Sequence, residues 1–115
     1  MKVAIPVWKN RVAPVFDTAD RWLSISVTGD RWKIEQEVAF ADSLPEMKVQ
    51  ELLQQKVEYL ICGAIPYRYE SFLKSTGCEV SSFIAGKPED VIQALIDNNI
   101  GETSFLMPGC RQLKE

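Results

Sequence analysis

Histidine is absent from the 115 residues of this sequence, and its absence excludes several classes of site. Ser-His-Asp and Cys-His catalysis each need an imidazole, and so do HExxH zinc sites and Cys₂His₂ fingers. Long apolar runs are also missing, since none reaches the roughly 18 residues that a membrane span needs. The apolar N-terminal stretch, residues 1–8, is too short for the core of a signal peptide. We therefore expect no membrane partner.

Cysteine is scarce, and its spacing suggests no pairing. The three cysteines lie at positions 62, 78 and 110, and they form no CxxC pair. An odd set of this kind does not indicate a disulfide framework. We therefore expect a reduced protein located in the cytoplasm.

Basic residues are outnumbered, with thirteen Lys/Arg against sixteen Asp/Glu and a net charge of −3. Nucleic-acid-binding proteins usually carry a basic excess, so we expect no nucleic-acid partner. The charge is uneven, because residues 1–33 carry six basic and three acidic residues whereas residues 34–115 carry seven and thirteen. An anionic ligand is therefore expected to meet the N-terminal third of the chain.

The N-terminal part of the sequence has the patterns of strands. An apolar run over residues 2–8 predicts a buried strand, and residues 9–20 lack a stable period and predict a long loop. Alternation over residues 21–28 and 32–40, separated by Gly29-Asp30, predicts a β-hairpin. In the second of these strands the apolar residues are expected on one face: Trp32, Ile34, Val38 and Phe40.

The rest of the chain alternates between helix and strand patterns. Ser43 and Glu46 form a possible capping box for a helix that runs to about residue 56, with Met47 facing inward. Further helices are predicted over residues 66–77 and 88–98, and strands over 59–62 and 78–84. The order β-β-β-α-β-α-β-α predicts one α/β domain over residues 1–101, with a five-stranded mixed sheet and helices on its faces. Residues 102–115 are expected to form a flexible tail.

The predicted topology also indicates where a ligand would bind. In open α/β sheets, ligands bind beyond the carboxyl ends of the parallel strands. Residues 8–20, 62–65 and 83–87 should meet there, and two of these segments lead into helices. Gly63 and Gly86 would let the backbone approach a ligand closely. This arrangement suits a polyanion or an anionic metal–sulfide cluster, although such turns occur in any α/β domain.

Several side chains of these segments have two readings. Arg11, Arg68 and Lys87 supply positive charge, which a bound anion needs and which a solvated surface also carries. Cys62 ends an apolar strand, so it either packs in the core or ligates a metal, and Cys78 is expected to pack. Cys110 lies in a polar tail and is either a ligand or a chance residue. Asp17 and Asp20 either bind Mg²⁺ or serve as turn residues.

Four segments together resemble a known family. They are MKVAIPV at the N-terminus, RVAPVFD over residues 11–17, ICGAI over 61–65 and MPGC over 107–110. The chain resembles, over essentially its whole length, the dinitrogenase iron–molybdenum cofactor biosynthesis family of the NifX, NafY and NifB C-terminal type. The resemblance implies a ribonuclease H-like fold. It also implies a carrier or scaffold, not an enzyme, that binds an iron–sulfur or molybdenum–iron–sulfur cluster or precursor and meets a cluster donor or acceptor protein.

The resemblance also implies a set of site residues. The motif positions are Arg11 as counter-charge, Asp17, Cys62 or Cys110 as metal ligand, and Gly63 for close approach. We add the neighbouring loop residues as cofactor-binding candidates: Ala64, Gly86 and Lys87. Some members are thought to use a histidine ligand, so here a thiolate or electrostatic holding must suffice. Two alternatives remain, an interaction module with a vestigial site and a metal-dependent hydrolase of ribonuclease H-like fold.

Overall fold

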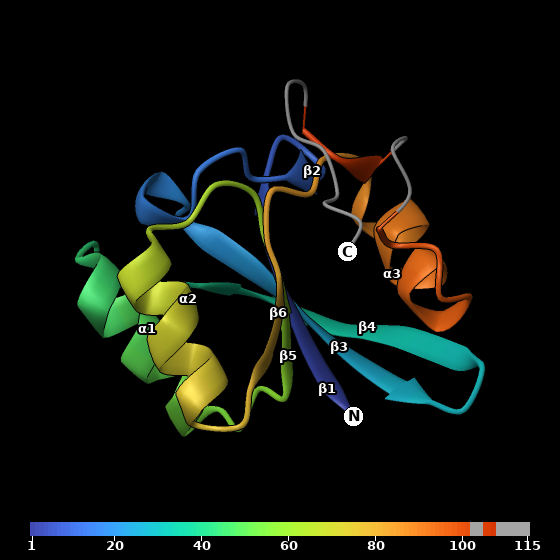
Figure 1. Cartoon of the computed structure of the whole chain (residues 1–115), viewed down its shortest axis with the longest axis horizontal. Coiled ribbons are helices and arrows are strands. Elements are labelled where there is room, and N and C mark those ends of the chain that lie inside the picture. The colour runs from blue at the N-terminus through green and yellow to red at the C-terminus, as the bar shows by residue number, and fades with distance from the viewer. Residues whose placement is uncertain (102–104, 108–115) are drawn as a thin grey trace, which may run out of the picture.

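A computed structural model describes residues 1–101 and 105–107 of the chain. A mixed β-sheet lies in the middle, with helices α1 and α2 on one face and helix α3 on the other (Figure 1). The predicted mixed α/β class is therefore confirmed. No helix in the described part of the chain is long and apolar enough to cross a membrane.

The sheet has the strand order β4-β3-β1-β5-β6, and the short strand β2 pairs with β1 outside this path. The strands are β1 (Lys2–Trp8), β2 (Arg11–Val12), β3 (Arg21–Thr28), β4 (Arg31–Ala39), β5 (Tyr59–Ile61) and β6 (Glu79–Ser81). The helices are α1 (Pro45–Gln54), α2 (Tyr67–Ser75), α3 (Pro88–Ile96) and the 3-10 helix η1 (Phe16–Thr18). The sequence predicts five strands because it assigns β2 and η1 to a loop. The ribonuclease H-like label remains a prediction.

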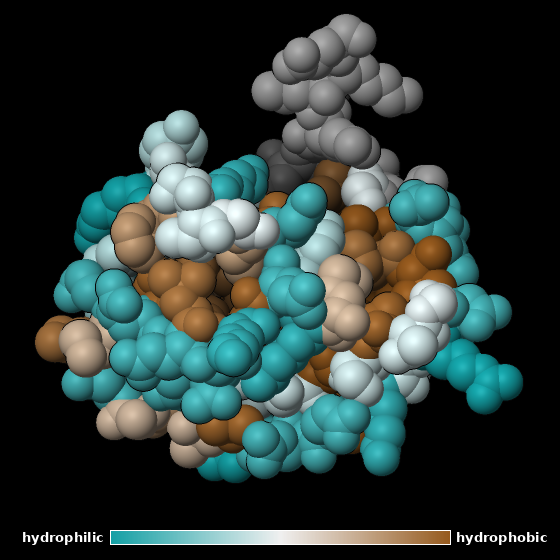
Figure 2. All heavy atoms as spheres, turned by 90° about the horizontal axis from the view of Figure 1, so that it is seen from below, coloured by the Kyte–Doolittle hydropathy of each residue, from teal (hydrophilic) through white to brown (hydrophobic). Residues whose placement is uncertain are grey.

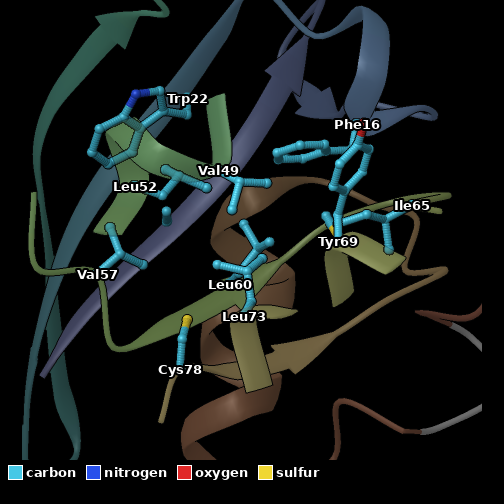
Figure 3. Close-up of a cluster of buried hydrophobic side chains, with 12 residues drawn as sticks. Phe16, Trp22, Val49, Leu52, Val57, Leu60, Ile65, Tyr69, Leu73 and Cys78 are labelled. Atoms are coloured by element: carbon cyan, nitrogen blue, oxygen red, sulfur yellow. The ribbon is translucent and has the colours of Figure 1, made fainter. Parts of the chain in front are cut away.

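Strand β1 is the centre of the sheet, antiparallel to β3 and parallel to β5. Its side chains alternate between the two faces, as a strand requires. Ala4 points into the core under α1 and α2, which also contains Trp22, Leu52 and Leu60 (Figure 3). Val3, Ile5 and Val7 belong to the core under α3. An almost uninterrupted apolar run thus serves two cores at once.

The hairpin of β3 and β4 departs from its predicted pattern through a β-bulge. Ser24 pairs with Gln36 whereas Ile25 pairs with Ile34, so Glu35 is an extra residue in β4. A one-residue insertion moves the following side chains to the other face of the sheet. Trp32 therefore packs on the α3 core, and Val38 and Phe40 pack on the α1/α2 core. The prediction that all four apolar residues share one face is wrong.

The start of α1 also differs from the prediction. Leu44 is the N-cap residue, and no side chain caps the helix, so the expected capping box of Ser43 and Glu46 does not form. Asp42 Oδ1 instead accepts a hydrogen bond from the Leu44 N–H at 2.8 Å. Met47 is exposed, because the face of α1 that meets the sheet carries Lys48, Val49 and Leu52.

Residues 105–107 belong to the packed domain. Leu106 forms an antiparallel bridge with Ile84, and Phe105 and Leu106 pack against the α3 core. These residues lie beyond residue 101, where we predict the domain to end, and the domain boundary stays a prediction. Seen from below, hydrophilic side chains cover much of the surface, and hydrophobic side chains show mainly in two larger areas, with smaller patches near the edges of the view (Figure 2). This appearance fits a sheet with one core on each face.

Candidate functional site

Four segments meet at the carboxyl ends of β1, β5 and β6, and we call them the carboxyl-end loops: residues 13–16, 62–65, 82–86 and 105–107. Backbone hydrogen bonds join them in this order across the upper part of the molecule (Figure 1). The Ala64 N–H donates to the Pro14 carbonyl at 2.8 Å, the Phe83 N–H to the Gly63 carbonyl at 2.9 Å, and the Met107 N–H to the Phe83 carbonyl at 2.9 Å. The structure therefore brings together the segments that the topology places at one end of the sheet.

Gly63 is required by the crossing of two of these loops. A Cβ atom at this position would lie 2.4 Å from the carbonyl oxygens of Ala13 and Pro14. Ala64 is equally committed, since its N–H bonds to Pro14 and its carbonyl accepts from the Phe16 N–H at 2.8 Å. The close approach predicted at Gly63 is thus made by the chain's own backbone, and these peptide groups are already satisfied.

Gly86 and Lys87 lie on the α3 side of the site. Gly86 has a φ of +135° and its carbonyl accepts from the Val12 N–H at 2.9 Å, which ties this loop to β2. Lys87 is the N-cap residue of α3. It borders a groove of about 490 Å³ whose floor includes the apolar side chains of Val7 and Leu23.

A second groove of about 320 Å³ lies on the family-motif segment. Its lining consists of Trp8, Ala13, Pro14, Val15, Thr18, Ala19 and Asp20. The Trp8 side chain is 56% exposed, and the Lys9 ammonium lies 4.5 Å from the centre of its ring. Lys9 and Asn10 form the turn between β1 and β2 with φ values of 52° and 61°. Arg11 follows on β2, exposed and paired with Trp8.

Cys62 is completely buried in the α1/α2 core. Burial raises the pKa of its thiol far above the ordinary value, and the negative charge of Glu70 adds to this effect. Cys78 is also buried, and burial raises its pKa as well. Both thiols are therefore buried and hold their protons more strongly than a free thiol does. Cys110 lies outside the described residues.

Asp17 sits on η1 beside a buried lysine that the sequence analysis does not single out. The Lys48 ammonium donates to the carbonyls of Asp17 at 2.8 Å and Ala19 at 2.6 Å. Burial lowers the pKa of Lys48, while the nearby carboxylates of Asp20 and Asp17 oppose this shift. Asp17 Oδ1 is itself buried without a hydrogen-bond partner among the described residues. Most helix lysines are solvated, so no signal in the sequence identifies this one.

Arg68 belongs to the α1/α2 layer. Its guanidinium donates to the Tyr69 hydroxyl at 3.1 Å, and that hydroxyl donates to the Glu46 carboxylate. The hydrogen bond to Tyr69 is the main cause that raises the Arg68 pKa, and Asp17 contributes to the same effect from η1. Arg68 lies on α2 and Lys87 directly precedes α3, and these two helices cover opposite faces of the sheet.

Over residues 1–101 and 105–107, no three or more His, Cys, Asp or Glu side chains cluster to hold a metal ion.

Comparison with known proteins places this arrangement in a family. The family described as dinitrogenase iron-molybdenum cofactor matches residues 1–98, which include the segments RVAPVFD and ICGAI. The chain belongs to this family. The match confirms the resemblance of the motif segments up to residue 98, and the family name relates the chain to the iron–molybdenum cofactor of dinitrogenase.

Solved structures share the fold of this family member. The protein PH0822 is 20% identical with a TM-score of 0.77, covering 85% of this chain and 91% of that protein. A protein from Methanocaldococcus jannaschii, provisionally named a dinitrogenase, is 20% identical with a TM-score of 0.63, covering 86% and 90%. A Thermotoga protein provisionally named NifB is 24% identical with a TM-score of 0.62, covering 99% and 98%. No curated protein matches the chain.

Proposed function

We propose that this protein is a small carrier or scaffold, not an enzyme, that holds a metal–sulfur cluster or its precursor as cargo at the carboxyl-end loops. One observation carries the proposal. The family segments RVAPVFD and ICGAI are hydrogen-bonded to each other at the end of the sheet where α/β proteins bind ligands. The segment that leads to MPGC reaches the same place through the bond between Met107 and Phe83.

We assign the thiol ligand of the cargo to Cys110 and a packing role to Cys62. Cys62 is buried and its pKa is raised, so ligation there would require the core to open. Cys110 follows Met107 by three residues in the sequence, and the Met107 N–H donates to the Phe83 carbonyl in the carboxyl-end loops. Three residues span at most about 11 Å even when fully extended, so the proposed ligand stays within reach of these loops.

Positive charge is the second part of the proposed site. Lys9 and Arg11 are exposed on the turn and strand beside the Trp8 groove, and Lys87 borders the other groove. One thiolate and a few cations hold an anionic cluster less firmly than a complete ligand set does. Loose holding suits a carrier that takes its cargo from a donor protein and passes it to an acceptor. We place this exchange in the cytoplasm, where thiols stay reduced.

An anaerobic titration tests the proposal. Reduced protein is titrated separately with tetrathiomolybdate and with ferrous iron plus sulfide, and charge-transfer absorbance is followed. We expect saturation at a fixed stoichiometry, a loss of most of the binding in Cys110→Ala, and unchanged stoichiometry in Cys62→Ala. If neither probe changes the spectrum of wild-type protein, the carrier function is overturned. Binding that survives in Cys110→Ala but not in Cys62→Ala would reverse the assignment of the ligand.

A further inference from the structure

Lys48 is a charged side chain in a place where charged side chains are rare. It lies on α1, is only 2% exposed, and forms no ion pair within the described part of the chain. Lysine is almost never buried to this extent without a partner, because an ammonium loses its hydration there. Its retention in the core calls for a specific set of hydrogen bonds.

Those hydrogen bonds all go to one segment. Two of the three ammonium donors reach the carbonyls of Asp17, in η1, and of Ala19, the C-cap residue of η1. The Phe40 ring lies 5.3 Å from the ammonium, and the carboxylates of Asp17 and Asp20 supply negative potential nearby. The lysine therefore satisfies carbonyls that a three-residue helix leaves without partners of its own.

The same segment forms one wall of the Trp8 groove. Residues 13–20 are held at one end by the bonds of Pro14 and Phe16 to Ala64. At the other end, the Phe40 N–H donates to the Asp20 carbonyl at 2.9 Å and β3 begins at Arg21. Between these two ends, the contacts from Lys48 hold Asp17 and Ala19. Within η1, the Ala19 N–H donates to the Phe16 carbonyl at 3.2 Å. Removing the lysine would leave Asp17 and Ala19, in the middle of this wall, without the side-chain contacts that hold them.

We propose that Lys48 is the positioning residue of the candidate site. Its buried ammonium fixes residues 15–20 from α1, although it lies outside the family-motif segments and does not touch the cargo. This inference rests on the proposed function, because a positioning role requires that a cargo binds at the groove. It predicts that the shape of the groove, and with it the affinity for an anionic sulfide, depends on a helix residue on the core side of the loop.

Three variants test the inference. Lys48→Met removes the charge and the donors at similar length, Lys48→Gln removes the charge but keeps N–H donors, and Lys33→Met changes an exposed lysine of β4 as a control. Amide hydrogen exchange of the full chain without ligand is measured for residues 15–20 and for β3. We expect exchange in residues 15–20 to accelerate at least about tenfold in Lys48→Met, because bonds from a charged donor are lost. Lys48→Gln should be intermediate, and β3 should not change.

Tetrathiomolybdate affinity is the second readout, with an expected loss of about tenfold in Lys48→Met and none in Lys33→Met. Exchange in residues 15–20 that stays within twofold of wild type in Lys48→Met would overturn the inference. Faster exchange with unchanged affinity would also overturn it, since the lysine would then be structural only. If wild-type protein does not bind the probe at all, the proposed function fails, and the exchange data alone decide whether Lys48 fixes the segment.

Discussion

Space, and not backbone angle, makes glycine necessary at position 63. The two carbonyl oxygens that a Cβ atom would meet at 2.4 Å belong to the backbone, so no side chain can move aside. Gly29 offers a matched contrast, because it has a positive φ of +62° but open space around the position of a Cβ atom. The two glycines therefore separate a steric requirement from a conformational one.

We predict that Gly63→Ala lowers the free energy of unfolding by at least about 3 kcal/mol, at the upper end of what overpacking costs. Gly29→Ala should cost only about 1 kcal/mol, the penalty of a left-handed conformation for a residue with a Cβ atom. Urea unfolding followed by circular dichroism measures both values. Equal losses in the two variants would mean that residues 13–16 can move away from residue 63.

Burial of the two described cysteines has a chemical consequence. Burial raises the pKa of both thiols and also shields them from reagents in the native protein. We predict that iodoacetamide leaves both residues unmodified in native protein and modifies both in urea. Peptide mass spectrometry measures the labelling at each position. Equal labelling of Cys62 in native and unfolded protein would contradict the packing role that we assign to it.

At the scale of elements, strong local signals predict position, and weak ones do not. Pro45 and Pro88 start their helices as expected, because proline suits a first helical turn and little else in a helix. Strand β2 is missed because two residues carry no period, and it forms only through pairing with β1. The predicted capping box does not form, because the helix starts one residue later than Ser43 requires, with Leu44 as its N-cap residue. The faces of β4 depend on a bulge that alternation cannot reveal.

The bulge at Glu35 lies on an edge strand, which suggests a protective effect. Edge strands expose unpaired backbone groups, and a bulge makes pairing with another molecule less regular. We predict that deleting Glu35 keeps the pairs of Ser24 with Gln36 and of Ile25 with Ile34, leaves the core intact, and promotes self-association. Sedimentation velocity over a range of concentrations measures it. Glu35→Ala keeps the extra residue and is the control, so association of both variants would contradict the role of the bulge.

At the scale of the whole molecule, β1 is shared by both cores and has neighbours on both edges. Its amides should therefore open only when the entire domain unfolds. We predict that Ala4 and Ile5 exchange most slowly under native conditions, whereas the amides of the exposed strand β4 exchange faster through local opening. Native-state hydrogen exchange by NMR measures both. Equally slow exchange in β4 would mean that the hairpin and the central sheet unfold as one unit.

The sequence predicts the place of the candidate site better than its contents. Topology alone brings the segments around Trp8, Gly63 and Lys87 to one end of the sheet, because parallel strands end together. It does not reveal which groups remain available there. Gly63 and Ala64 are consumed by packing of the loops on each other, a result of tertiary contacts. Lys48 contacts the wall of the groove from α1, on a helix face whose burial depends on the whole fold.

The three tryptophans occupy three different environments, so the fluorescence spectrum of the protein reports on its state. Trp22 is buried, with its indole N–H bonded to Glu51 at 3.1 Å, and Trp32 is half-buried, bonded to Gln93 at 2.9 Å. Trp8 is largely in water at the groove of the proposed cargo. A coloured cluster arriving there would quench the long-wavelength emission first. Opening of the core would instead shift the short-wavelength emission of Trp22, so one spectrum distinguishes loading from unfolding.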